Sequence, residues 1–247
     1  MIFIVAKMLN LLSRSVDFVL AFPQAELDID IYMKLPIGFD QIDGEKYVLK
    51  LNRSLYGLKQ GSHNWYKKLH QTLIDRDFKP SDIDPCVYYS SNSIIIVYVD
   101  DVIIISKKES TLDAIVKSLF EGEEKFNLTD EGSLDKYLGI DIRDLGKDSY
   151  ELCQPFLIER IIKLVGLEET DKQKRTTPVG KPLLYRNLEG KPYKKQWNYQ
   201  VAVGMLNHLQ ATTRPDISMA MHQCVRFCND PKLSHERALQ RIVRYLI

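Results

Sequence analysis

The hydrophobic pattern of the chain is densest in residues 93–106, where two blocks rich in Ile and Val flank the adjacent acids Asp100 and Asp101. β-branched residues at this density favour strands, and an apolar run bounded by polar residues is typical of a buried strand. Two carboxylates in the middle of such a run indicate a reversal of the chain. We therefore expect a hairpin with strands at residues 94–99 and 102–105.

The rest of the pattern predicts an α+β chain whose second half is helical. Residues 28–35 alternate acids with apolar residues, which is typical of a half-buried strand. The other expected strands cover residues 16–22, 47–51, 137–142 and 150–152, the last two joined by a turn at Gly146 and Lys147. Expected helices, recognised by apolar spacing and by Gly or Pro at their ends, cover residues 2–12, 58–78, 111–126, 155–165, 197–212, 216–228 and 234–247.

Composition narrows the partners that the chain can have. Its formal net charge is +1, so attraction of the whole molecule to nucleic acid is not expected. The four cysteines follow no disulfide pattern, which favours a reduced, intracellular setting. The apolar residues 2–12 are too short for a membrane span and lack the features of a signal peptide, so no membrane partner is expected.

Two local clusters stand out from this balanced composition. Residues 172–195 are rich in Lys and Arg, and their prolines keep the segment extended, so it suits either a nucleic-acid backbone or a solvated linker. The second cluster has the residue types of a zinc site, but its spacing fits no common zinc finger, and we expect ordinary helix packing instead. Its members are His222, Cys224, Cys228 and His235.

Asp17 is a single acid in the apolar segment 16–22. If its strand lies beside the hairpin, its carboxylate meets those of Asp100 and Asp101. Carboxylates placed together repel one another unless a proton or a cation offsets their charge, and hard oxygen ligands suit Mg²⁺. Two such ions, roughly 3.5–4 Å apart, serve phosphoryl transfer in polymerases and nucleases. The simpler interpretation is a solvated acidic turn.

A second candidate site lies in residues 54–66, which read Ser-Leu-Tyr-Gly-Leu-Lys-Gln-Gly-Ser-His-Asn-Trp-Tyr. Gly57 and Gly61 allow a backbone to approach a ligand closely. Lys59 and Gln60 can reach phosphates or base edges. The alternative is a loop that leads into a capped helix. No P-loop sequence is present, so a P-loop ATPase is not supported.

Six short motifs in one order resemble a known family. The chain resembles the reverse transcriptase of copia-type LTR retrotransposon Gag-Pol polyproteins from about Arg14 to its last residue. One such motif alone would be weak evidence for the family, whereas six in the same order are highly specific. The motifs are Asp-Phe-Val-Leu-Ala-Phe at 17–22, Leu-Tyr-Gly-Leu-Lys-Gln at 55–60, Tyr-Val-Asp-Asp at 98–101, Tyr-Leu-Gly at 137–139, Thr-Arg-Pro-Asp at 213–216 and Arg-Tyr-Leu at 244–246.

The resemblance implies a right-hand polymerase, an RNA-directed DNA polymerase (nucleotidyltransferase) that adds deoxynucleotides to a primer 3′-hydroxyl. Residues 1–145 would hold partial fingers and a palm with an antiparallel sheet and a catalytic hairpin. Residues 146–247 would hold a helical thumb or connection, ending before ribonuclease H. The implied partners are an RNA template, a DNA primer, deoxynucleoside triphosphates and the missing polyprotein segments (most of the fingers, ribonuclease H and integrase). The implied location is a cytoplasmic virus-like particle and the nucleus.

The resemblance also implies roles for single residues. Asp17 and Asp100 match the acids that hold two Mg²⁺ ions, with Mn²⁺ as the alternative ion, and Asp101 matches a third, less direct acid. Phe22 matches the position under the incoming sugar, where a bulky ring excludes a 2′-hydroxyl. The nucleotide is further contacted by Gln60 and Gly61, and the primer by Tyr98, Val99, Tyr137, Leu138 and Gly139, the last three as the primer grip.

One departure from the family pattern bears on activity. After Leu-Lys-Gln the family usually has Ala-Pro-Arg, whereas this chain has Gly61, Ser62 and His63. With this change and few residues before Asp17 for fingers, the alternative function is a catalytically inactive nucleic-acid-binding remnant of a transposable element. A degenerate fragment without a stable fold is a third interpretation.

Overall fold

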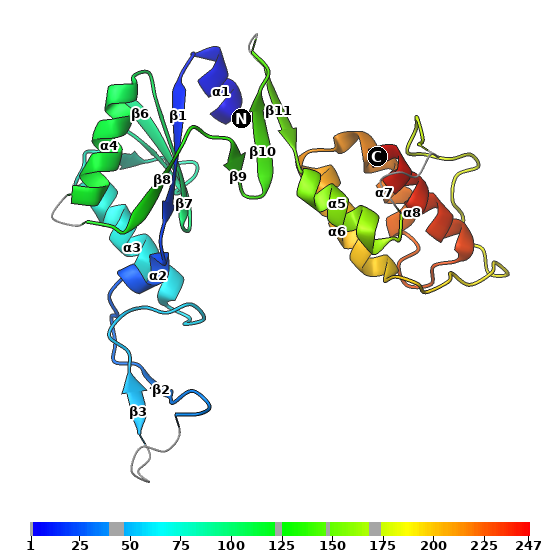
Figure 1. Cartoon of the computed structure of the whole chain (residues 1–247), viewed down its shortest axis with the longest axis horizontal. Helices are drawn as coiled ribbons and strands as arrows, with labels where there is room; N and C mark the ends of the chain where they lie inside the picture. The colour runs from blue at the N-terminus through cyan, green and yellow to red at the C-terminus, as the bar shows by residue number, and fades with distance from the viewer. Residues whose placement is uncertain (1, 40–46, 122–124, 147–148, 168–173) are drawn as a thin grey trace. The chain divides into compact units, whose positions relative to one another are not determined.

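The computed structural model describes residues 2–39, 47–121, 125–146, 149–167 and 174–247, which form two compact units (Figure 1). The first unit is built on Met1–Asp135, and the second on Lys136–Gly146 and Tyr150–Ile247. Both contain antiparallel sheets and helices, so the α+β class predicted from the sequence is confirmed. The predicted turn residue Lys147 and residues 122–124 and 172–173 lie outside the described residues.

A six-stranded antiparallel sheet is the centre of the first unit, and the hairpin predicted from the apolar run forms its two middle strands. Each strand pairs antiparallel with its neighbours. In spatial order the strands are β4 (Lys79–Pro80), β5 (Val87–Tyr89), β6 (Ser93–Tyr98), β7 (Asp101–Ser106), β1 (Leu12–Phe18) and β8 (Leu128–Gly132).

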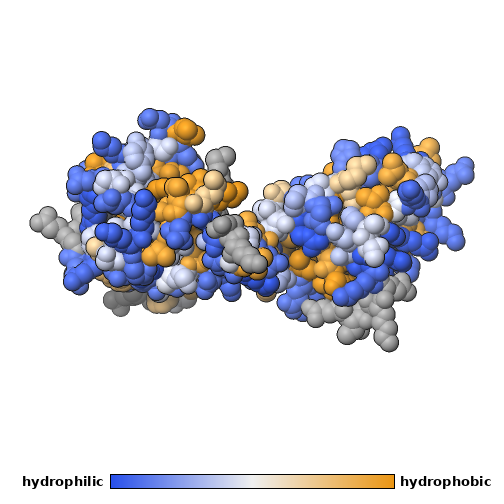
Figure 2. All heavy atoms as spheres, turned by 90° about the horizontal axis from the view of Figure 1, so that it is seen from above, coloured by the Kyte–Doolittle hydropathy of each residue, from blue (hydrophilic) through white to orange (hydrophobic). Residues whose placement is uncertain are grey.

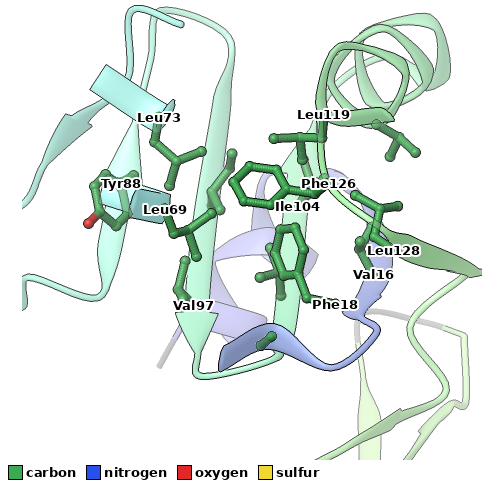
Figure 3. Packing of buried hydrophobic residues seen from close by; sticks show 14 of the residues in the cluster. Val16, Phe18, Leu69, Leu73, Tyr88, Val97, Ile104, Leu119, Phe126 and Leu128 are labelled. Atoms are coloured by element: carbon green, nitrogen blue, oxygen red, sulfur yellow. The ribbon is translucent and has the colours of Figure 1, made fainter. Parts of the chain in front are cut away.

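Two helices, α3 (Gly61–Ile74) and α4 (Glu109–Glu121), pack on one face of this sheet. Figure 3 shows Leu69 and Leu73 of α3 and Leu119 of α4 pointing toward Phe18 and Ile104 of the sheet. Because strand side chains alternate between faces, the side chains next to Phe18 and Ile104 in sequence point to the opposite face. The core therefore fixes which face of the sheet the acids of β1 and β7 occupy.

The remaining elements of the first unit are short. They are α1 (Ile2–Met8), α2 (Ala21–Gln24) and a two-stranded sheet of β2 (Tyr32–Lys34) with β3 (Val48–Lys50). The half-buried strand predicted at 28–35 is confirmed only in part: Tyr32–Lys34 form β2 with Met33 half-buried between exposed neighbours, whereas residues 28–30 lie outside the strand. The three residues of its partner strand β3 are all exposed, so this two-stranded sheet has no buried residue among those that the structure describes.

Several predicted boundaries are also wrong, each for a local backbone reason. The first helix ends before Asn10, which has a left-handed φ of 49°, so β1 begins at Leu12 rather than at residue 16. The helix expected at 58–78 is shorter, because turns fill residues 56–60 and Asp77 has a left-handed φ of 63°. The helix expected at 111–126 begins at Glu109, is described as far as Glu121, and does not include residues 125 and 126.

The second unit consists of a three-stranded sheet and a helical bundle (Figure 1). The strand predicted at 137–142 is interrupted, because Leu138 and Gly139 have left-handed φ angles of 49° and 75° and form a tight turn. The strands are β9 (Lys136–Tyr137), β10 (Ile140–Asp144) and β11 (Tyr150–Cys153). The helices are α5 (Pro155–Leu164), α6 (Tyr199–Thr212), the 3₁₀ turn η1 (Pro215–Ile217), α7 (Ser218–Val225) and α8 (Leu233–Leu246).

Two of the four residues that have the types of a zinc site, Cys224 and His235, are buried in the second unit. His235 is buried, and its ring nitrogens lie 3.0 Å from the Lys232 amide and 3.1 Å from the Tyr185 carbonyl oxygen. Cys224 is buried in the helical core, and no group of three or more His, Cys, Asp or Glu side chains that could hold a metal ion occurs among the described residues.

Hydrophilic side chains cover much of the face shown in Figure 2, with apolar patches between them. In the described part of the chain, no helix has the length and hydropathy needed to cross a bilayer.

Candidate active site

The turn of the β6–β7 hairpin contains only Val99 and Asp100, because Tyr98 and Asp101 are the last register pair. Val99 has a φ of 59°, a left-handed conformation that costs a β-branched residue about 1–2 kcal/mol. Strain of this kind persists only where surrounding contacts hold it, and it is common at functional sites. Tyr98 and Val99 are both exposed beside the acids, with 56% and 39% of their surface accessible.

Asp17 and Asp101 are direct register partners on the neighbouring strands β1 and β7. Directly opposed residues share a face, and their Cβ atoms lie about 4.5–5.5 Å apart. The Phe18 amide donates a 2.9 Å hydrogen bond to the Asp100 carbonyl, which ties the turn to β1. The structure therefore brings Asp17 to the same corner of the sheet as the adjacent acids Asp100 and Asp101, which are far from it in sequence.

The three carboxylates repel one another. Burial, followed by the charges of Asp100 and Glu131, raises the pKa of Asp17. Burial and the charges of the neighbouring acids also raise the pKa of Asp101. None of the described residues donates a hydrogen bond to these three carboxylates or forms an ion pair with them, so nothing in this part of the chain compensates their charge.

Sequence reasoning missed the fourth acid of this corner, Glu131 on β8. Ser15 Oγ donates a 3.1 Å hydrogen bond to Glu131 Oε2, and Ser15 lies two residues from Asp17 on the same face of β1. The acid pair Asp130 and Glu131 was visible in the sequence, but its pairing with β1 depends on a bulge between Ser15 and Val16 that has no local signal.

The donor set fits a divalent cation chemically, because it offers hard carboxylate oxygens without basic partners. In the ranges that the structure describes, however, no three His, Cys, Asp or Glu side chains are close enough together to hold an ion. Binding of an ion here would therefore require the carboxylates of Asp17, Asp100 and Asp101 to come closer together than they lie in this structure.

A helix side chain holds the turn in place. Trp65 Nε1 donates a 2.7 Å hydrogen bond to the Val99 carbonyl oxygen. The buried indole also makes edge contacts with Phe18 and Phe126, at ring-centroid distances of 5.1 and 5.6 Å. The bond from Trp65 to the turn is a long-range contact that the apolar spacing of α3 cannot reveal. The position of Asp100 thus depends on the hydrophobic core.

The three residues expected to bind a nucleotide lie together in the first unit. Phe22 on α2 stacks on Tyr56, with ring centroids 4.5 Å apart and an angle of 26° between the rings. A Cβ atom added to Gly61 would lie 3.6 Å from Phe22 Cδ2 and 3.0 Å from the Leu55 carbonyl oxygen. Gln60 occupies the N-cap position of α3, immediately before Gly61. The absence of a side chain at residue 61 therefore lets this backbone approach the Phe22 ring.

The residues expected to contact the primer fall into two groups. Tyr98 and Val99 lie at the hairpin turn of the first unit. Tyr137, Leu138 and Gly139 belong to the second unit, where Tyr137 ends β9 and the other two form the turn into β10.

Comparison with known proteins shows which family the chain is similar to. Residues 2–181 match the family model described as "Reverse transcriptase (RNA-dependent DNA polymerase)". The chain is 32% identical, over 98% of its length, to the Retrovirus-related Pol polyprotein from transposon TNT 1-94 of Nicotiana tabacum, and 32% identical over 94% to that from transposon RE1 of Arabidopsis thaliana. It covers 19% and 16% of those polyproteins.

A shorter relative is similar over most of its own length. The chain is 31% identical to the Putative transposon Ty5-1 protein of Saccharomyces cerevisiae, over 92% of this chain and 73% of that protein. No solved structure matches the chain.

Proposed function

We propose that this chain, which belongs to the reverse transcriptase family of copia-type retrotransposons, copies an RNA template by adding deoxynucleotides to a primer 3′-hydroxyl. The observation that carries the proposal is the register that pairs Asp17 with Asp101 and leaves Asp100 in the adjoining turn. In this proposal the first unit supplies the palm and part of the fingers. The second unit, which includes β9 and β10, supplies a thumb or connection.

The acids have distinct roles in the proposed reaction. Asp17 and Asp100 hold two Mg²⁺ ions, and Asp101 supports them from the register position opposite Asp17. When bound, these ions activate the attacking hydroxyl and stabilise the leaving oxygen of the triphosphate. The strain at Val99 and the bond from Trp65 keep the turn rigid, so that Asp100 is held in place before substrate arrives.

The nucleotide lies on Phe22 in this proposal. The ring is held from one side by Tyr56, and the backbone of Gly61 lies close to it, so it cannot move away from a sugar placed on it. A 2′-hydroxyl would collide with this fixed ring, which selects deoxynucleotides. Gln60 contacts the nucleotide and template base, Tyr98 and Val99 contact the primer end, and Tyr137, Leu138 and Gly139 act as the primer grip.

Primer extension on an RNA template tests the proposal directly. We expect the chain to extend a DNA primer in the presence of Mg²⁺ and Asp100→Asn to reduce the rate about 10³-fold, because one ion loses its main ligand. Asp82→Asn is the matched control, since Asp82 is an exposed acid in the 81–86 loop. Equal rates for the chain and Asp100→Asn would reject the assignment.

Substitution of Phe22 tests nucleotide selection. Phe22→Ala should raise the use of ribonucleotides relative to deoxynucleotides by roughly 10–100-fold, because the space taken by the ring becomes free for a 2′-hydroxyl. The readout is the ratio of kcat/KM for a matched pair of nucleoside triphosphates. Phe22→Tyr keeps the bulk and should keep the discrimination; an unchanged ratio in Phe22→Ala would show that this ring does not face the sugar.

Two observations favour the alternative of a nucleic-acid-binding remnant without turnover. The carboxylates of the described acids do not converge on one ion position, and Gly61, Ser62 and His63 stand where the family has Ala-Pro-Arg. Salt-dependent binding of a primer–template without any extension would support this alternative.

A further inference from the structure

A groove in the second unit is lined almost entirely by basic and apolar residues. It runs between the extended residues 175–185 and helix α8, with a volume of about 700 Å³. Of the described residues that line it, none is acidic. Its cations are Arg175, Lys181, Arg237, Arg241 and Arg244.

The extended segment is fixed to α8 rather than free in solvent. Arg241 donates from Nε to the Thr177 carbonyl at 3.1 Å and from Nη2 to Thr177 Oγ1 at 2.9 Å. The Arg175 amide donates a 3.2 Å bond to the Arg244 carbonyl. Val179 and Leu184 pack against the helical core. The interpretation of residues 172–195 as a solvated linker therefore fails for this part, and the groove has fixed walls.

Three of the cations have no partner within the described residues. The side chains of Arg175, Lys181 and Arg237 make no hydrogen bond or ion pair there. Some other basic residues of the same unit are compensated, as in the Arg143–Glu151 ion pair at 3.2 Å. Positive charge that is concentrated in a groove and left uncompensated attracts a polyanion even when the net charge is only +1.

We propose that this groove binds the phosphodiester backbone of nucleic acid. The inference rests on the proposed function, because it makes the template–primer of the polymerase the occupant. Cations on both walls can neutralise successive phosphates and release their counterions, which is the main sequence-independent source of affinity for nucleic acid. Basic residues outside the groove, such as Lys195, are not part of the site.

A charge-matched pair of variants of the full chain tests the groove. One removes three cations from the groove (Arg175→Gln, Lys181→Gln and Arg237→Gln), and the control removes three exposed cations of the same unit outside it (Arg160→Gln, Lys163→Gln and Lys195→Gln). Fluorescence anisotropy with a labelled RNA·DNA hybrid, with single-stranded RNA and with single-stranded DNA is measured across a salt series. Thermal melting confirms that each variant folds.

The groove variant should bind at least about tenfold more weakly at low salt, and its salt slope should fall by about 0.9 for each duplex phosphate that the groove no longer neutralises. The control should bind like the unmodified chain. A version with Arg175→Lys and Arg237→Lys keeps the charge and should bind normally.

Three results would overturn the inference: unchanged binding by the groove variant, an equal loss of affinity in the control, or binding to anionic lipid vesicles without binding to any nucleic acid. Failure of the inference can be told apart from failure of the proposed function. If the groove variant binds normally and the chain still extends primers, only the groove assignment is wrong. If the chain binds through the groove but does not extend, the catalytic proposal is wrong and the groove stands.

Discussion

Asp17→Asn should reduce primer extension about 10³-fold and, at neutral pH without Mg²⁺, increase the free energy of unfolding. The two effects have one cause. Asp17 lies opposite Asp101 in the sheet register, and Asp100 and Glu131 add to the negative charge around it. Neutralising Asp17 relieves this repulsion in the folded protein and also removes the ligand that an ion needs. Gain of stability together with loss of activity is the trade-off expected where like charges are held together at a site.

The pH dependence of this stabilisation follows from the direction of the pKa shift. Burial and neighbouring acids raise the pKa of Asp17 in the folded state above its unfolded value of about 4. Below that unfolded value the carboxyl is protonated in both states and carries no penalty. As the pH rises through the folded-state pKa, the folded protein must accept the charge and stability is lost. The unmodified chain and Asp17→Asn should therefore have similar stability in acid and diverge as the pH rises.

Urea unfolding at a series of pH values measures this difference, with Asp82→Asn as the control for removal of one exposed acid. A second measurement compares the Tm of the two proteins with and without Mg²⁺. Because a ligand stabilises the state that binds it, Mg²⁺ should raise the Tm of the unmodified chain more than that of Asp17→Asn. A loss of stability in Asp17→Asn at neutral pH, or an equal response to Mg²⁺, would contradict a shared acidic site.

The sequence predicted the hairpin and its acids because that signal is local. A run rich in β-branched residues favours buried strand and acids within it favour a turn, so the pattern was enough to predict a hairpin within residues 93–106. The turn lies one residue earlier than predicted, at Val99 and Asp100, because Asp101 pairs with Tyr98 and belongs to β7. The proximity of Asp17 was conditional on strand order, which no local pattern encodes. The structure supplied that order through the pairing of β1 with β7.

Features that depend on long-range pairing or on single backbone angles were not predictable. To predict that Glu131 lies beside Asp17, one would have to know that β1 pairs with β8 and that this pairing contains a bulge. The strand predicted at 137–142 is interrupted by left-handed φ angles at Leu138 and Gly139, which the sequence pattern does not reveal. The groove required the hydrogen bonds of Arg241 with Thr177, which join segments far apart in sequence. In each case residue types were visible, but the partner that gives them a role was not.

Catalysis in this proposal depends on a tryptophan that never touches substrate. Trp65 fills the core between Phe18 and Phe126, and its indole N–H is bonded to the carbonyl of the strained turn residue Val99. Packing and hydrogen bonding therefore converge on the peptide that precedes Asp100. A substitution that removes the hydrogen bond of Trp65 but keeps its packing should show how much each of them contributes to the position of Asp100.

Trp65→Ala should lower the free energy of unfolding by about 3–5 kcal/mol, because it removes a large buried side chain. Trp65→Phe keeps much of the packing but leaves the Val99 carbonyl without its donor, which should cost about 1–3 kcal/mol and reduce extension by roughly 10–100-fold as Asp100 loses its fixed position. Urea unfolding and single-turnover extension measure the two effects on folded protein.

Trp197→Phe is the matched control, because the buried Nε1 of Trp197 has no hydrogen-bond partner among the described residues and this residue belongs to the core of the second unit. It removes the same indole without breaking a bond to the turn, so extension per folded molecule should be unchanged. If Trp65→Phe and Trp197→Phe reduced extension equally, loss of general packing would account for both, and the bond from Trp65 to Val99 would have no special role in placing Asp100.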